Sequence, residues 1–123
     1  HQFTATPDRI AAIRATDGLL GTTLADLLTF FSAQYGELHD DGAFIGGAIH
    51  DPLAVLALSH PHLFERVARH VVVEIRGEHT RGMTVIDQRK VTERQTPNCD
   101  MLTSVDDAAV FDVTLEAIVH FIR

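Results

Sequence analysis

Apolar residues recur at helical spacing in the first third of the chain. A first helix is predicted to begin after Thr6, an N-cap residue, with Pro7 as its first residue and Asp8 in its first turn. It buries Ile10 and Ile13 and is expected to end at Gly18. A second helix is predicted to start at Thr22 or Thr23 and to end at Gly36. Its buried stripe is expected to contain Leu24, Leu27, Leu28, Phe31 and Tyr35.

Two more helices are predicted further along the chain. One covers residues 51–59 and ends at the turn "SHPH". The other is capped by Asp106 or Asp107 and carries an apolar side made of Val110, Val113, Leu115, Ile118 and Phe121. Between the second and third helices, residues 36–49 are rich in glycine and aspartate, which predicts a long loop.

Strand patterns dominate the second half. The run "VVVEI" (71–75) predicts a strand that is buried on both faces, and "TRGMTVID" (80–87) predicts another, with Gly82 marking a bulge or a close backbone approach. "CDMLTSV" (99–105) predicts a further strand. The opening residues are expected to be the tail of a strand, which implies more sheet upstream. Helices that precede strands in this way favour an α/β fold with an open sheet.

Composition narrows the class of protein. The 123 residues suffice for one modest domain, and 46% of them are apolar. Acidic residues outnumber basic ones by 17 to 10, and no Lys/Arg cluster is present, so we expect no nucleic-acid partner and no anionic membrane surface. The apolar runs are too short to span a bilayer. Cys99 is the single cysteine, which excludes an internal disulfide and is compatible with the reducing cytoplasm.

Histidine is frequent, with eight copies that share no helical or strand period. His60 and His62 flank Pro61, but a zinc site at this pair would need two further ligands that the sequence does not supply, so a surface loop is favoured. The chain begins "HQFTATPD" without an initiator methionine. We therefore expect it to be the later part of a longer protein.

The segment "GGAIHDPLAV" (46–55) offers two interpretations. In the first, Asp51 caps the following helix and Pro52 occupies its first turn. In the second, His50 is a proton donor beside Asp51, an oxygen ligand for a hard metal ion, at the edge of a cleft. The two glycines suit either interpretation, because they let the backbone approach another element closely.

Taken together with "ATPDRIAAIRA" and "TRGMTVID", this segment resembles the nucleoside hydrolases of the inosine–uridine type, and the motifs occur in the order found in the C-terminal part of that family. The resemblance implies an open mixed α/β sheet of Rossmann-like character, of which residues 1–123 are a single partial domain. It implies hydrolysis of the N-glycosidic bond of ribonucleosides to ribose and free base, in nucleoside salvage. It further implies a homo-oligomer in the cytoplasm.

The resemblance also assigns roles. Asp51 would bind Ca²⁺, which activates the attacking water and chelates the ribose hydroxyls, and His50 would protonate the leaving base. The histidine favours the inosine–uridine or cytidine–uridine groups of the family. Phe44 is a candidate for the base pocket, whereas Tyr35 continues a helical stripe and is expected in the core. Thr80 and Arg81 are weaker candidates for a ribose or phosphate contact than for a structural role.

One feature of the family is absent from these residues. The aspartate-rich signature that supplies most calcium ligands and the general base would lie in an N-terminal part of the same protein. Ca²⁺ takes about six to eight oxygen ligands, so Asp51 alone cannot build the site. Asp40 and Asp41 match no ligand of the family and are expected to be solvated. Two alternatives therefore stay open, namely a truncated homologue without catalytic activity and a module that binds nucleosides or sugars without cleaving them.

Overall fold

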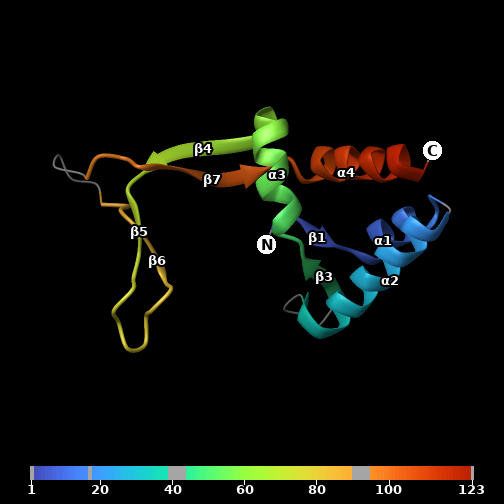
Figure 1. The fold of residues 1–123 in the computed structure, drawn as a ribbon, viewed down its shortest axis with the longest axis horizontal. Coiled ribbons are helices and arrows are strands. Elements are labelled where there is room, and N and C mark those ends of the chain that lie inside the picture. Colours follow the sequence, from blue (N-terminus) through green and yellow to red (C-terminus); the bar gives the residue numbers. More distant parts are fainter. Residues whose placement is uncertain (1, 17, 39–43, 90–94, 123) are drawn as a thin grey trace. The chain divides into compact units, whose positions relative to one another are not determined.

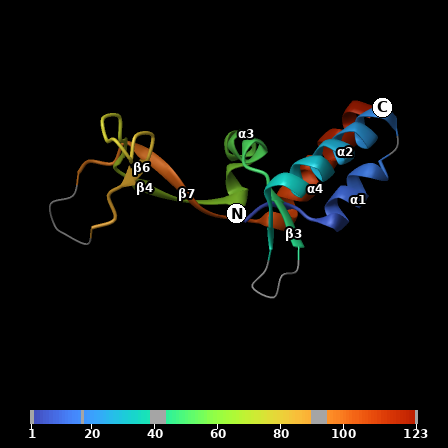
Figure 2. The same cartoon turned by 90° about the horizontal axis from the view of Figure 1, so that it is seen from below.

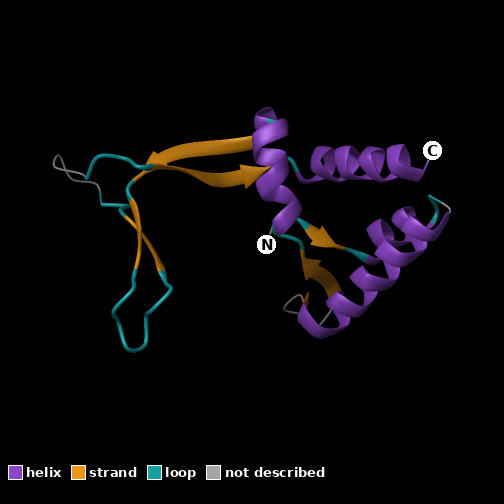
Figure 3. Ribbon diagram, viewed as in Figure 1, coloured by secondary structure: helices purple, strands orange, loops and turns teal. Residues whose placement is uncertain are grey.

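The computed structural model describes residues 2–16, 18–38, 44–89 and 95–122. The chain forms two compact units: unit 1 contains His1–Leu63 and Val105–Arg123, and unit 2 contains Phe64–Ser104. All α-helices of the described residues belong to unit 1, whereas unit 2 contains strands and loops (Figure 3). No described helix has the length and apolar character needed to cross a membrane.

Helix α1 (Pro7–Arg14) begins as the sequence predicts. The Thr6 side-chain oxygen accepts a hydrogen bond from the Arg9 backbone N–H (3.3 Å), and Pro7 is the first helical residue. Ile13 is only 4% exposed and joins the core. The predicted stop was wrong, because α1 ends at Arg14 and Gly18, at φ +78°, instead starts the next helix.

Helix α2 (Gly18–Tyr35) starts earlier than predicted. Thr22 does not cap it, because its hydroxyl donates to the Gly18 carbonyl inside the helix (3.1 Å). Its buried face is centred on Gly21, Ala25 and Ser32. A Cβ atom at Gly21 would collide with Thr16 and the Ile13 carbonyl, so α1 approaches closely at this point. Because of this close contact, Leu27 and Tyr35 are exposed to solvent, contrary to the predicted stripe, whereas Leu24 and Leu28 pack on the core.

The segment predicted as a long loop contains two strands, so that prediction was wrong. β1 (Thr4–Ala5), β2 (Gly36–Leu38) and β3 (Phe44–Ala48) form an antiparallel sheet in the order β1-β3-β2. Gly46 has φ +119°, and a Cβ atom there would collide with the Ala5 carbonyl. At Gly47 a Cβ atom would lie 2.7 Å from the Phe31 ring. Glycine thus serves close packing of β3 against β1 and α2, as the sequence predicted.

Helix α3 (Asp51–Ser59) has the predicted bounds, and α4 (Asp107–Ile122) begins where the sequence predicts. α3 is followed by the 3-10 turn η1 (Pro61–Leu63), and α4 is capped by Asp106, whose Oδ1 accepts from the Ala109 N–H (3.1 Å). Helices α1, α2 and α4 pack side by side around Ile13, Ala25 and Ile118 (Figures 1 and 2). Val110 is fully buried as expected, but Phe121 is exposed.

Unit 2 contains two pairs of strands. β4 (Phe64–Arg69), which the sequence analysis missed, pairs with β7 (Cys99–Val105), and β5 (Val71–Val73) pairs antiparallel with β6 (Thr84–Ile86). The prediction that residues 71–75 are buried on both faces was wrong, because β5 lies in a two-stranded hairpin that leaves Val72, Val73 and Ile75 exposed. Gly82, at φ +91°, lies in the turn of this hairpin and not in a bulge of the strand.

Candidate functional site

His50 and Asp51 lie at the junction between β3 and α3. Strand β1 pairs with the end of β3, with Ala5 opposite Gly47 and Thr4 opposite Ala48. One residue later the Ile49 N–H donates to the Phe3 carbonyl (2.9 Å). His50 follows the sheet with a helical backbone conformation (φ −96°, ψ −41°), and Asp51 begins α3. Both side chains belong to exposed residues, so the sheet delivers an imidazole and a carboxylate to the surface at neighbouring positions.

The carboxylate of Asp51 does not cap α3. The N-cap residue is His50, which makes no side-chain capping hydrogen bond, and the first turn is closed by the Leu53 N–H donating to the His50 carbonyl (3.1 Å). The interpretation of Asp51 as the capping residue was therefore wrong. Its negative charge still lies in the first turn, where it interacts favourably with the helix dipole. No hydrogen bond or ion pair engages its oxygens within the described ranges.

The chemistry that Ca²⁺ requires is met here only in part. Exposed carboxylate oxygens are hard ligands of the kind that Ca²⁺ prefers, so Asp51 fits as one ligand. Across residues 2–16, 18–38, 44–89 and 95–122, however, no group of three or more His, Cys, Asp or Glu side chains is placed to hold a metal ion. Asp40 and Asp41 lie outside the described residues. The described residues can thus contribute one calcium ligand but not a complete site.

Phe44 is the first residue of β3, the strand that leads to His50. Its backbone therefore belongs to the same element as the candidate site, while its side chain lies outside what the structure describes. Tyr35, predicted in the core, is instead the exposed last residue of α2, and its ring centroid lies 5.2 Å from that of Phe31.

The other histidine and hydroxyl candidates have local roles. His60 ends α3 and its Nδ1 lies 2.9 Å from the Ser59 hydroxyl, while His62 is exposed on η1, with the two imidazole centroids 6.0 Å apart. Thr80 and Arg81 are exposed in the β5–β6 turn of unit 2, where the Thr80 carbonyl accepts from the Met83 N–H (2.9 Å). His60 and His62 therefore lie at the end of α3 and in the turn that follows it, and Thr80 and Arg81 lie outside the strands of the hairpin.

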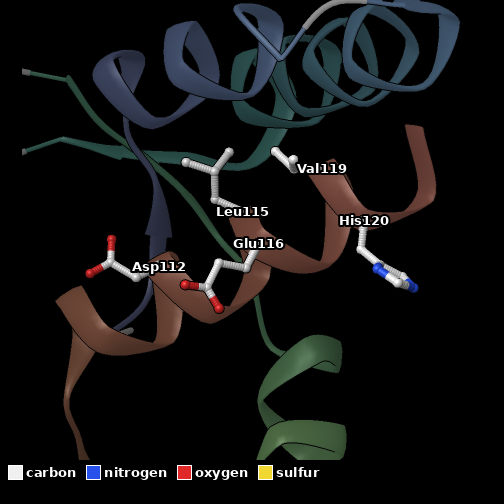
Figure 4. Close-up of a pocket in the computed structure, with 5 residues that line it drawn as sticks. All are labelled: Asp112, Leu115, Glu116, Val119 and His120. Carbon is white, nitrogen blue, oxygen red and sulfur yellow. The ribbon is translucent and has the colours of Figure 1, made fainter. Parts of the chain in front are cut away.

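A hollow of about 510 Å³ lies along one face of α4, and its lining residues all belong to that helix. Figure 4 shows Asp112 and Glu116 directing their carboxylates to one side of the helix, with Leu115 and Val119 turned towards the helices above and His120 one turn further on. The ionisable residues recur every fourth position, which is the spacing of one helix face. Neither His50 nor Asp51 lines this hollow.

A second, smaller cavity of about 210 Å³ lies inside unit 1 and borders the candidate site. Ile49 and Pro52, which flank His50 and Asp51, form part of its wall. The other wall residues are mainly apolar and come from β1, α1, α2 and α4; they include Phe3, Ile13, Leu28 and Phe111. The segment that carries the motif therefore passes over a space that side chains do not fill.

Arg9, which the sequence analysis did not single out, makes several close contacts in the described part of unit 1. Its guanidinium donates to both carboxylate oxygens of Asp107 (2.9 and 2.7 Å) and to the Thr4 carbonyl (3.0 Å). The rings of Phe3 and Phe111 lie 5.1 and 5.2 Å from its Cζ, and the side chain is only 15% exposed. A partner 98 residues away gives no local sequence signal.

In unit 2, hydrogen bonds from the Arg89 side chain hold the pKa of the Asp87 carboxyl far below its usual range. The ionised Asp87 carboxylate therefore stabilises the fold at pH values above the ordinary aspartate pKa of about 4, and this contribution is lost as the pH falls through the lowered pKa.

We expect Arg89→Met to raise the Asp87 pKa, but not fully to about 4, because the backbone N–H of residue 89 still donates to Oδ1. NMR titration of the carboxyl carbon measures this shift. Arg81→Met is the control, and an unchanged Asp87 pKa in Arg89→Met would contradict the assignment.

Comparison with known proteins identifies the family. The family model for "Inosine-uridine preferring nucleoside hydrolase" matches residues 1–112. The chain is 33% identical over 123 residues to the pyrimidine-specific ribonucleoside hydrolase RihA of Shewanella woodyi, covering 100% of this chain and 38% of the relative. The RihA protein of Salmonella gallinarum is 34% identical over 114 residues, with 91% and 35% covered.

The chain also has a fold similar to that of a solved structure. The purine-preferring ribonucleoside hydrolase from Gardnerella vaginalis superposes with a TM-score of 0.74 at 24% identity, covering 97% of this chain and 36% of that chain. This confirms the predicted α/β fold class with open sheets. The chain spans little more than a third of the length of the relatives that it matches. The extent of the family match shows that the chain belongs to the inosine–uridine preferring nucleoside hydrolase family.

Proposed function

We propose that residues 1–123 form the C-terminal part of a calcium-dependent nucleoside N-ribohydrolase. The observation that carries the proposal is the pair His50 and Asp51, exposed side by side where β3 meets α3 in a chain of this family. The Asp51 oxygens are not engaged in capping, so the helix start does not compete with a ligand for them. A role in substrate chemistry therefore accounts for this pair better than a role in helix capping.

His50 is proposed to act as the general acid. When the N-glycosidic bond breaks, its electron pair moves to the base, and a proton from the imidazole neutralises the charge that develops there. Water adds to the ribosyl carbon and loses a proton, which yields ribose and the free base. An imidazole can donate and accept a proton under mild conditions, which makes histidine the commonest general acid or base of enzymes. Its exposed position at the end of β3 allows a substrate to reach it.

Asp51 is proposed to hold Ca²⁺ together with ligands supplied by the rest of the longer protein. Bound calcium would supply Lewis acidity to the attacking water and chelate the ribose hydroxyls. The contribution of this chain is one carboxylate at a fixed position, the first residue of α3. The absence of a group of three potential ligands among the described residues supports a site shared with other parts of the protein.

The substrate is proposed to be a pyrimidine ribonucleoside such as uridine. The RihA relatives are named as pyrimidine-specific, and the presence of His50 agrees with a pyrimidine or mixed preference. Phe44, on the strand that leads to His50, is proposed to contact the base. The homo-oligomer and the cytoplasmic location implied by the family resemblance are part of the same proposal.

An assay of ribose release tests the proposal. The protein that carries residues 1–123 within a full-length nucleoside hydrolase should hydrolyse uridine in the presence of calcium and lose this activity with a chelator. The 123-residue chain alone should bind Ca²⁺ weakly and hydrolyse neither uridine nor inosine, because most ligands lie elsewhere. Robust turnover by the 123-residue chain would overturn the shared site.

The same measurements separate the alternatives. A module that binds nucleosides without cleaving them would show uridine binding by calorimetry but no ribose release from the full-length protein. A truncated homologue without catalytic activity would show neither. Either result from the full-length protein would reject the proposed enzyme.

A further inference from the structure

Arg9 is connected to the candidate site through Phe3 and Thr4. Arg9 Cζ lies over the Phe3 ring, 5.1 Å from its centroid, and the Phe3 carbonyl accepts the hydrogen bond from the Ile49 N–H (2.9 Å). His50 and Asp51 follow directly. The same guanidinium holds the Thr4 carbonyl (3.0 Å), the next carbonyl of the strand. Two consecutive residues at the β1 end of the sheet are therefore fixed by Arg9.

The other end of this connection is anchored in α4. Asp107 accepts two hydrogen bonds from the Arg9 guanidinium, and a third goes to the Asp107 backbone carbonyl (3.2 Å). Arg9 Cζ also lies over the ring of Phe111, one turn further along α4, at 5.2 Å from the ring centroid. Because a planar guanidinium presents several donors in a fixed fork, it can hold β1 and α4 in one geometry, which an ammonium group cannot do.

The cavity of about 210 Å³ borders the segment that carries His50 and Asp51, because Ile49 and Pro52 form part of its wall. Close packing therefore does not fix this segment on the side that faces the cavity. The Ile49–Phe3 hydrogen bond is the described backbone contact that ties the residue before His50 to the sheet. The position of β1 therefore decides where His50 and Asp51 are presented.

We propose that Arg9 is a positioning residue, which holds the His50–Asp51 segment in place through β1. The catalytic part of this inference rests on the proposed function. Its structural part rests on the successive contacts of Asp107 with Arg9, of Arg9 with Phe3, and of Phe3 with Ile49. Arg9 makes no contact with a substrate in this scheme. It acts on the reaction through the backbone that carries the acid and the metal ligand.

Amide hydrogen exchange of the full-length protein tests the contacts that lead from Asp107 through Arg9 and Phe3 to Ile49. Arg9→Met should speed exchange of the Ile49 amide by about tenfold or more relative to the His60 amide, which donates to Leu56 within α3. Arg9→Lys should also speed it, because lysine keeps the charge but cannot bridge Asp107 and Thr4 between two rings. Arg14→Met is the matched control, since Arg14 lies on the same helix and pairs with Asp26 at the surface (2.7 Å).

Three outcomes would overturn the proposal. They are an unchanged exchange rate of the Ile49 amide in Arg9→Met, an equal acceleration of exchange at the Ile49 and His60 amides, and a wild-type exchange rate of the Ile49 amide in Arg9→Lys. Equal acceleration would mean that Arg9 serves overall stability only. In the full-length hydrolase, Arg9→Met should lower kcat for uridine about tenfold, and lower it less for p-nitrophenyl riboside, which needs no proton from His50. If that protein cleaves no nucleoside, the proposed function fails, while the exchange measurement still decides the role of Arg9.

Discussion

His50→Ala in the full-length hydrolase is expected to reduce uridine and inosine hydrolysis by about 10² to 10⁴-fold while largely sparing p-nitrophenyl riboside. General-acid help has this magnitude, and it matters only where the leaving group needs a proton. A departing uracil or hypoxanthine needs one as the bond breaks, whereas nitrophenolate is already a stable anion. The measurement is the ratio of kcat/KM for the two substrates, because a general loss of structure lowers both values together.

His62→Ala is the matched control for this substitution. His62 is also an exposed histidine of unit 1, on η1 beyond the end of α3, and it should leave the ratio unchanged. Calcium affinity should hardly move in His50→Ala, since Asp51 is retained. An equal loss of activity towards both substrates would remove His50 from the role of general acid and leave it with a structural one.

Local signals in the sequence were sufficient for the starts of α1 and α4, but not for the start of α2, which begins at Gly18. Thr6 with Pro7, and Asp106 before α4, each satisfy free backbone N–H groups within a few residues, so their effect does not depend on distant parts of the chain. The bounds of α3 follow for a similar reason, since Pro52 favours the first turn of a helix. At α3, however, the same local reasoning places the cap at Asp51, whereas the N-cap residue of the structure is His50, which makes no side-chain capping hydrogen bond.

Tertiary packing explains where the sequence failed. The glycines of β3 predict a loop, but at Gly46 and Gly47 they let β3 approach Ala5 and Phe31, and a strand results. Apolar character predicts the buried stripe of α2, but the close contact at Gly21 decides which face is buried and leaves Leu27 exposed. Neither outcome can be read from a window of a few residues.

The candidate site divides in the same way. The adjacency of His50 and Asp51 is a property of the sequence, and a recognisable motif was enough to find it. Their dependence on Arg9 is a property of the fold, because Arg9 and Asp107 are 98 positions apart and meet only when β1, α1 and α4 are assembled. Residues that position a site across a fold therefore escape a search by motif, even when they make as many contacts as Arg9 does.

Asp51→Asn is expected to weaken calcium binding by the full-length hydrolase about 100-fold or more while leaving its stability without calcium nearly unchanged. Removing even an outer partner of a metal ligand costs about 10 to 100-fold in affinity, and here a charged ligand of a hard cation is neutralised. The stability of α3 should change by less than about 1 kcal/mol, because the Asp51 side chain makes no capping bond and contributes only its interaction with the helix dipole.

Asp8→Asn supplies the matched control for that dipole interaction. Asp8 is an exposed aspartate in the first turn of α1 beside Pro7, as Asp51 lies in the first turn of α3 beside Pro52. Thermal unfolding without calcium should respond similarly and weakly to both substitutions, whereas calorimetric titration with Ca²⁺ should respond to Asp51→Asn alone. If Asp51→Asn lowers stability by clearly more than about 1 kcal/mol and leaves calcium affinity unchanged, Asp51 serves the helix start and the metal site must be built without it.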